Sequence, residues 1–244
     1  MFGFGEGTLT CTVNNTEPLP FVFKELLTRL KRDSILISCI QPVIASLGVF
    51  MNLLFIVLVW KQKNLHSVTN TYLVHLAIAD SVFVFFKTVV NLVSFFKSPI
   101  AFNYGFLGRG GCIMDTFVPF SCYYASLMIV TVVTLERYLA ICYPFKHRRM
   151  NGKSRTRKLL TACWITAALF GLAQAFETMD FLSFCIQFTG GNEDNVLYKY
   201  GNCQPLNRDI TNISSFILEF GTFFIAMIGK HCSIKHICLF IVFY

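Results

Sequence analysis

The chain has 244 residues, of which 55% are hydrophobic and only 14% are charged, and its mean hydropathy is positive. A soluble domain of this size could not cover so much apolar surface, so the composition excludes an ordinary soluble protein and predicts a polytopic membrane protein. The net charge of +8 does not indicate nucleic-acid binding, because the basic residues concentrate beside apolar segments, where the positive-inside rule explains them.

The N-terminal segment, residues 1–34, is polar and lacks the basic and apolar regions of a cleaved signal peptide. Asn14 begins a glycosylation sequon here, and Asn212 begins a second one, so both predict extracellular segments. Basic residues before the first apolar run outnumber those after it, which alone would place the N-terminus inside. The stretch 146–158 is basic and contains no acid, so it is the larger charge asymmetry in the chain and should lie in the cytoplasm. This placement predicts an extracellular N-terminus.

The apolar runs predict five transmembrane helices, each near the ~20 residues that cross a bilayer. Their expected ranges are 35–60, 71–96, 112–141, 159–179 and 211–228. The connecting segments are expected at 61–70 and 142–158 in the cytoplasm and at 97–111 and 180–210 outside, with an atypical cytoplasmic tail at 229–244. The predicted fold is therefore an all-α transmembrane helix bundle in the cell membrane.

The third span carries the most informative motif. Glu136, Arg137 and Tyr138 lie at its end, followed by Pro144 and the basic stretch, so this end should face the cytosol. Cys112 lies about 37 Å of helix upstream, far enough to reach the outer surface, where disulfides persist.

These features, together with Asn52, Leu76-Ala-Ile-Ala-Asp80 and Trp164 in the right order, resemble rhodopsin-like G-protein-coupled receptors over roughly residues 47–224. The resemblance implies a Cys112–Cys203 disulfide and a helix-packing role for Trp164. Cys11 and Cys185 should also face outside, where they either pair with each other or remain separate thiols. The other cysteines in spans, among them Cys39, are expected to be small core residues.

Asp80 should lie near the bilayer centre, about 15 Å from the inner end of its span, so it needs polar partners in the bundle. Ser126 and Asn52 are expected at the same depth. By resemblance, Asp80 and Ser126 bind a sodium ion, the only cofactor expected, and Asn52 bridges helices. The alternative is a hydrogen-bonded structural cluster with a protonated Asp80.

At the inner end, the resemblance implies that Glu136 restrains Arg137 until activation frees it to meet a G protein, with Phe145 as an apolar plug. The alternative is an interfacial ion pair that contributes little.

At the outer end, Pro119 stands where amine receptors carry an aspartate, which argues against an amine ligand. Lys87 is expected to meet a ligand carboxylate or an acid such as Asp115, or only to extend toward water. Thr116 and Phe120 are the other candidate ligand contacts.

The third helix and the acidic outer loop resemble those of neuropeptide receptors. The predicted function is therefore transduction of a peptide signal to a heterotrimeric G protein. With five of seven spans, the chain is expected to be a truncated product unable to signal alone.

One alternative is a non-signalling isoform that associates with full-length receptors and retains them in the endoplasmic reticulum. A transporter is disfavoured because internal repeats and broken helices are not evident, and the catalytic motifs of membrane enzymes are not found.

Overall fold

The computed structural model describes residues 16–20, 35–98, 100, 103–145, 152–177, 180–189, 197–204 and 221. Within this part of the chain, four helical segments are long and apolar enough to cross a membrane: Leu36–Lys61, Val68–Lys97, Gly108–Cys142 and Lys153–Phe176. The predicted helix bundle is thereby confirmed. The predicted fifth span, the tail, both sequon asparagines and the basic loop 146–151 lie outside the described residues, apart from Gly221.

The first helical segment begins close to the predicted position, and the other three begin three to six residues before the apolar runs that predict them. A π-helical turn, η2 (Leu36–Ile40), leads into α3 (Gln41–Lys61), and a short 3₁₀ turn, η3 (Lys63–Leu65), follows it. The next three helices are α4 (Val68–Lys97), α5 (Gly108–Cys142) and α7 (Lys153–Glu177). Their first turns hold polar and basic residues that a hydropathy argument assigns to loops, although a helix can continue into the head-group region.

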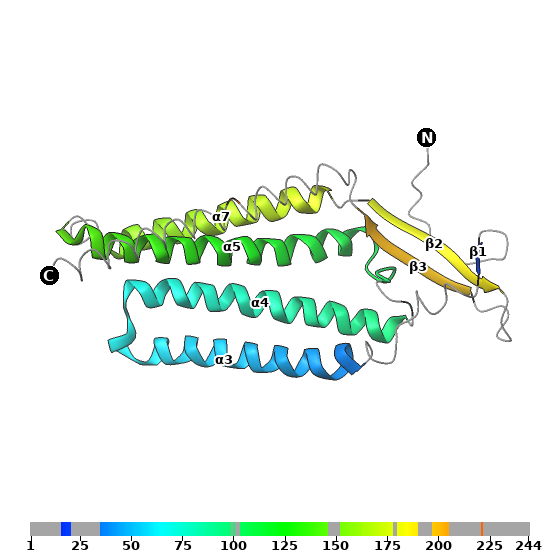
Figure 1. Cartoon of the computed structure of the whole chain (residues 1–244), viewed down its shortest axis with the longest axis horizontal. Helices are drawn as coiled ribbons and strands as arrows, with labels where there is room; N and C mark the ends of the chain where they lie inside the picture. Colours follow the sequence, from blue (N-terminus) through cyan, green and yellow to red (C-terminus); the bar gives the residue numbers. More distant parts are fainter. Residues whose placement is uncertain are drawn as a thin grey trace, which may run out of the picture.

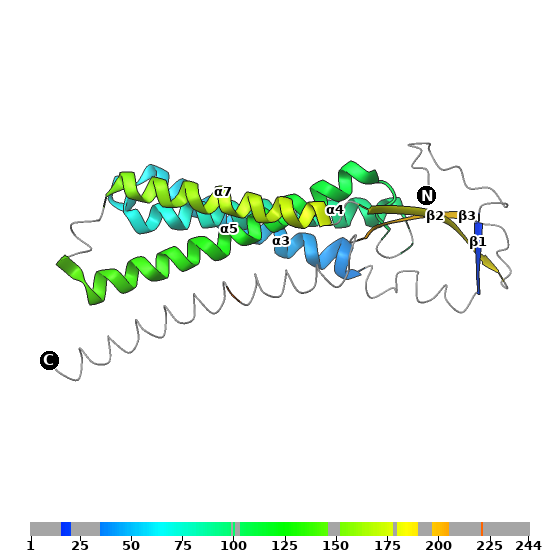
Figure 2. The same ribbon diagram turned by 90° about the horizontal axis from the view of Figure 1, so that it is seen from above.

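The four helices lie side by side along the long axis, with successive helices antiparallel (Figure 1). α3 packs on α4, α4 on α5, and α5 on α7, and the view from above places α7 over the bundle (Figure 2). The buried core lies between α4, α5 and α7. It contains Ala79, Cys122, Tyr124, Ala125 and Ala167 in one cluster and Tyr72, Ile129, Leu160 and Cys163 in a second.

Small residues let α5 and α7 approach closely. A Cβ placed on Gly171 would overlap with the Ser121 hydroxyl and would lie 2.9 Å from the Ser121 backbone nitrogen. Without a hydrophobic force between helices in lipid, such backbone proximity is a main source of packing energy. Cys122 and Cys163 are buried in this core as predicted, but Cys39 of η2 is exposed and lies outside it.

A three-stranded sheet lies at one end of the bundle, and the apolar pattern did not predict it. Its strands are β1 (Thr16–Pro20), β2 (Asp180–Thr189) and β3 (Leu197–Gln204), in the order β1-β2-β3. β2 and β3 pair antiparallel, whereas β1 pairs parallel to β2 with Thr16 opposite Cys185. We call this end of the bundle the sheet end and the other, where α3 ends and α7 begins, the basic end (Figure 1).

Asn103 fastens the sheet to the loop between α4 and α5. Its Oδ1 accepts hydrogen bonds from the backbone nitrogens of Gly105 at 2.9 Å and Gly201 at 3.0 Å, and its Nδ2 donates to Ser98 Oγ at 2.8 Å. The backbone nitrogen of Tyr104 adds a bond to Gly201 O at 2.7 Å. Gly201 has no room for a side chain, since a Cβ there would lie 2.9 Å from the Gly105 nitrogen.

Candidate functional site

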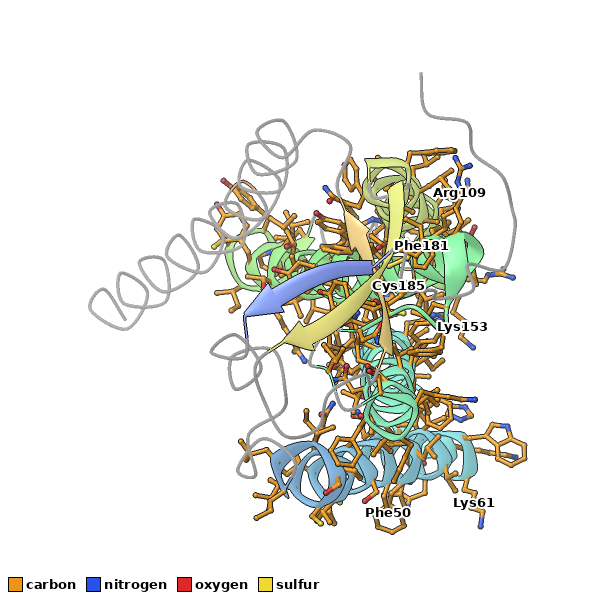
Figure 3. All side chains as sticks on the ribbon, turned by 90° about the vertical axis from the view of Figure 1, so that its right-hand side faces the viewer. Phe50, Lys61, Arg109, Lys153, Phe181 and Cys185 are labelled. Carbon is orange, nitrogen blue, oxygen red and sulfur yellow. A yellow bond between two sulfur atoms is a disulfide. The ribbon has the colours of Figure 1, made fainter. Side chains whose placement is uncertain are left out.

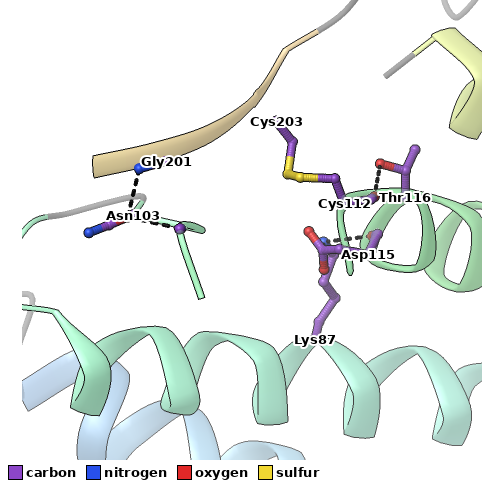
Figure 4. Close-up of a disulfide and its surroundings, with 8 residues drawn as sticks. Lys87, Asn103, Cys112, Asp115, Thr116, Gly201 and Cys203 are labelled. Atoms are coloured by element: carbon purple, nitrogen blue, oxygen red, sulfur yellow. Dashed lines mark hydrogen bonds and ion pairs between the residues drawn. A yellow bond between two sulfur atoms is a disulfide. The ribbon is translucent and has the colours of Figure 1, made fainter. Parts of the chain in front are cut away.

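The sheet end is closed by the predicted disulfide. Cys112, in the second turn of α5, is bonded to Cys203 of β3 with a Cα–Cα distance of 5.6 Å (Figure 4). Cys112 is fully buried. The bond closes a loop of 91 residues and fixes the sheet over the start of α5. Cys185 is also buried and disulfide-bonded, which excludes the alternative of a free thiol there, whereas Cys11 lies outside the described residues.

Beside this disulfide, a lysine and an aspartate from two helices form an ion pair. Lys87 Nζ of α4 lies 3.0 Å from Asp115 Oδ1 of α5 and also donates to the Asp115 backbone oxygen at 3.3 Å (Figure 4). The Lys87 side chain is 36% exposed and that of Asp115 only 13%. Of the roles predicted for Lys87, the structure shows pairing with Asp115.

The other predicted ligand contacts, Thr116, Pro119 and Phe120, all lie on α5. Thr116 Oγ1 donates to Cys112 O of its own helix at 3.1 Å, so its hydroxyl proton is used locally. Pro119 is buried inside α5, and Phe120 packs near Tyr124 with ring centroids 6.2 Å apart. Asp115 and Lys87 are therefore the polar groups that these candidates offer at the sheet end.

At mid-depth, Asp80 of α4 accepts a hydrogen bond of 2.7 Å from Ser126 Oγ of α5. The two residues meet in one layer, as their predicted depths require. Asn52 of α3 is half-buried and makes no hydrogen bond to either of them within the described part of the chain. A carboxylate and a hydroxyl give two adjacent oxygens, which is the donor type that hard cations prefer, so the pair fits part of a sodium shell.

Trp164 of α7 has the packing role predicted for it. Its indole nitrogen donates to His75 Nδ1 of α4 at 3.2 Å, and its ring packs on the cluster around Tyr124 and Ala167. His75 was not among the predicted residues, because a lone histidine in an apolar run carries no signal of its partner.

At the opposite end, the predicted side-by-side pairing of Glu136 and Arg137 is wrong. Glu136 Oε1 instead lies 3.0 Å from Arg155 Nη2 in the first turn of α7. Consecutive residues of a helix point in different directions, so Glu136 faces α7 while Arg137 is exposed. The prediction missed Arg155 because it began the fourth helix at residue 159.

The remaining residues of this motif lie around Arg137. Tyr138 is half-buried, and its ring contacts that of Tyr143 with centroids 6.2 Å apart. Pro144 is exposed, and Phe145 beside it is 87% exposed. Arg137 and Phe145 thus present a cation and a large apolar side chain at the basic end of the bundle.

Comparison with known proteins assigns this architecture to a family. The profile of the 7 transmembrane receptor (rhodopsin family) matches residues 51–237. The chain is 32% identical over 128 residues to the thyrotropin-releasing hormone receptor of Gallus gallus, covering 52% of the chain and 31% of that receptor. It is 31% identical over 149 residues to neurotensin receptor type 1 of Rattus norvegicus, covering 59% and 34%. The neuromedin-K receptor of Oryctolagus cuniculus is 29% identical over 166 residues, covering 66% and 34%.

The matched region spans about a third of the length of these curated relatives. These relatives are named as receptors, and the matched profile confirms the predicted resemblance to rhodopsin-like receptors. The matched range contains the Cys112–Cys203 disulfide, the Glu136-Arg137-Tyr138 motif and helices α4, α5 and α7. It also contains the second half of α3. The chain is a multi-pass membrane protein that belongs to the rhodopsin family of seven-transmembrane receptors.

Proposed function

We propose that the sheet end of this bundle receives an extracellular peptide and that the basic end faces a heterotrimeric G protein. The observation that carries the proposal is the contrast between the ends. One end holds a disulfide and a half-buried ion pair, and the other presents Arg137 and Phe145 to solvent. The relatives named for thyrotropin-releasing hormone, neurotensin and neuromedin K support a peptide as the ligand class.

The chemistry of the two ends supports this orientation. Disulfides persist outside the reducing cytosol, which favours an extracellular sheet end. Lys61, Lys63, Lys153 and Arg157 gather at the other end, and clustered basic residues beside spans favour the cytoplasmic side. The N-terminus would then be extracellular, and the predicted glycans on Asn14 and Asn212 would be on the same side.

Lys87 is the residue through which we expect the peptide's charge to be recognised. Its side chain is more exposed than that of Asp115, so we expect an approaching anion to reach Lys87 before Asp115. A C-terminal carboxylate or an acidic side chain of the peptide has the required chemistry. Pro119 offers no counter-ion to an amine, so the ligand's anionic group is the more useful contact at this depth.

Binding of labelled thyrotropin-releasing hormone, neurotensin and neuromedin K to membranes that carry the chain tests the ligand class. A peptide that binds should lose about ten-fold or more in affinity with Lys87→Met, because a charge-assisted hydrogen bond is removed. Lys97→Met, at the end of the same helix and outside the ion pair, is the matched control and should bind normally. Equal affinities for both variants would contradict the role of Lys87, and no binding by any peptide would contradict the ligand class.

Arg137 is the candidate G-protein contact at the basic end. A purified heterotrimer should co-purify with the chain and be lost with Arg137→Ala, while Arg109→Ala at the sheet end should leave the yield unchanged. Contact of this kind does not require nucleotide exchange, and the prediction that this chain alone does not stimulate exchange is tested in the same membranes. Equal heterotrimer yield from both variants would argue against Arg137 as the contact.

The alternative of a chain that retains other receptors has one observation in its favour. Among the described helices that follow α3, α4 packs against it most extensively, and large apolar side chains of α3 remain exposed. They include Phe50, labelled in Figure 3, and Met51, which are 60% and 61% exposed. A second bundle could pack on this face and form a receptor oligomer, although lipid could cover it equally. The alternative predicts that co-expression lowers the surface display of a full-length relative such as neurotensin receptor type 1, and unchanged display would remove it.

A further inference from the structure

A cavity of about 700 Å³ opens on the side of the bundle at the basic end, far from the proposed ligand site. Three parts of the chain line it. They are the last turns of α3 with Ile56, Val59 and Trp60; the turn and first helical residues His66, Ser67, Val68, Thr71, Val74 and His75; and the start of α7 with Lys153, Thr156 and Arg157. α4 forms the floor between α3 and α7.

The cavity is positively charged at its inner rim. Lys153 and Arg157 line it, and none of the described residues that line it is acidic. Lys153 and Arg157 are exposed, and neither forms an ion pair with any residue that the structure describes, whereas Arg155 of the same turn is paired with Glu136. Viewed from the sheet end, Lys153 points to the same side of the molecule as Lys61 (Figure 3).

A hydroxyl group adds a donor to this rim. Ser67 Oγ accepts the hydrogen bond from the Asn70 nitrogen at 3.1 Å, so its own proton can go to another acceptor. Thr71 and Thr156 donate to backbone oxygens of their own helices, at 3.0 and 3.3 Å. Two cations and one hydroxyl donor therefore converge on the same opening, which is the chemistry that binds a phosphate group.

The cavity also has an apolar side, which we expect to adjoin the membrane because α3 and α4 are spans. Ile56 and Val74 line it, and Trp60 is 77% exposed at the end of α3. Tryptophan is typical of the level where lipid head groups meet acyl chains. A ligand that fits must combine an anionic phosphate with a hydrocarbon chain, which a free phosphate or a nucleotide does not.

We propose that this cavity binds an anionic phospholipid of the adjacent leaflet, with its phosphate between Lys153 and Arg157 and an acyl chain along Ile56, Val74 and Trp60. The assignment of this leaflet to the cytoplasmic face rests on the orientation proposed above, but the site itself does not. The lipid would brace α3 against the start of α7 at the end of the bundle that carries Glu136 and Arg137.

Trp60 and Trp164 are the two tryptophans of the chain, so fluorescence can report on the site directly. The chain is reconstituted into phosphatidylcholine vesicles that contain a minor fraction of brominated lipid, either phosphatidylserine or phosphatidylcholine, because bromine quenches tryptophan on contact. A Trp60→Phe variant gives the background from Trp164. Brominated phosphatidylserine should quench Trp60 more strongly, since each cation near an anionic lipid favours it about five-fold and two cations about twenty-five-fold.

The double variant Lys153→Gln with Arg157→Gln should remove this excess quenching, and Lys158→Gln, an exposed neighbour that does not line the cavity, should keep it. Equal quenching by the two brominated lipids in the wild-type chain would overturn the proposal, even if the double variant failed to insert. Equal loss in Lys158→Gln would mean diffuse surface charge instead of a site. Relief of the quenching by inorganic phosphate in the buffer would mean a free-anion site, which also overturns the lipid assignment.

Discussion

The ion pair between Glu136 and Arg155 joins two helices at the end where the proposed switch lies. Because the carboxylate of Glu136 is held by α7, Arg137 is left exposed next to it. The Glu136 side chain is 12% exposed and that of Arg155 30%, so solvent screens the pair only in part.

Arg155→Gln should lower the free energy of unfolding by about 1 kcal/mol, because it removes the ion pair between Arg155 and Glu136. Thermal unfolding in detergent micelles measures the change, and Lys158→Gln is the control on the same helix. The double variant with Glu136→Gln should be less destabilised than the sum of the two single variants. Additive losses would show that the two side chains are not coupled.

The pair of Asp80 and Ser126 makes a second prediction, which separates a sodium site from a structural hydrogen bond. If a sodium ion binds at Asp80, sodium chloride should raise the melting temperature more than choline chloride does, by mass action on the folded state. Ser126→Ala should reduce this difference. Ser81→Ala is the control, since Ser81 Oγ donates to Ala77 O of its own helix at 2.7 Å. A melting temperature that is the same in both salts would favour the hydrogen-bonded cluster.

Depth along a helix predicted the contact between Asp80 and Ser126, but it did not predict the surroundings of Asn52 or the partner of Glu136. Counting residues from the span ends brought Asp80 and Ser126 to one level, and their hydrogen bond follows. Depth says nothing of direction around the helix, so Asn52 was expected in the same cluster although it makes no hydrogen bond to Asp80 or Ser126. Arg155, the partner of Glu136, was missed because it lies in the first turn of α7, which was predicted to start at residue 159.

Among the helices, α5 and α7 make the tightest contact that the structure describes, and Gly171 is its centre. Gly171→Ala should destabilise the bundle by about 1–3 kcal/mol, because the added methyl meets backbone atoms of Ser121 and Phe117 that cannot rotate away. Gly48→Ala on α3, where nothing lies within 4 Å of the new methyl, is the control in the same unfolding experiment. Equal stability of the two variants would show that the helices separate at little cost.

The sheet depends on Asn103 as well as on the disulfide. Asn103→Ala should cost about 2–3 kcal/mol, because the buried backbone nitrogen of Gly201 loses its acceptor. Hydrogen exchange at β3 should then rise locally, and Asn64→Ala, at an exposed position of η3, should leave it unchanged. Unaltered exchange in Asn103→Ala would mean that the disulfide alone holds the sheet.

The spans themselves could be predicted because lipid requires long apolar runs, and all four described spans were found. The first turns of two of them could not, since α4 begins at Val68 and α7 at Lys153, before the apolar runs begin at residues 71 and 159. The sheet was missed because pairing between β1 and β2 joins segments far apart in the sequence, and no local pattern encodes that contact.

For the molecule as a whole, the family follows from the matched profile, but the direction of signalling follows from which end is outside. Ligand entry beside Lys87 and G-protein contact at Arg137 require the sheet end and the basic end to lie on opposite sides of the membrane, in that order. The lipid cavity at the basic end would then belong to the cytoplasmic leaflet.

Labelling of single cysteines in sealed microsomes tests this orientation most directly. In a background that replaces Cys39, Cys122, Cys142, Cys163, Cys232 and Cys238 by serine, Phe145→Cys at the basic end should react with a membrane-impermeant maleimide without detergent, because the cytoplasmic side faces the medium. Arg109→Cys, exposed at the sheet end, should react only after detergent opens the vesicles. The reverse pattern would place the disulfide in the cytosol and would contradict the proposed receptor function at both ends.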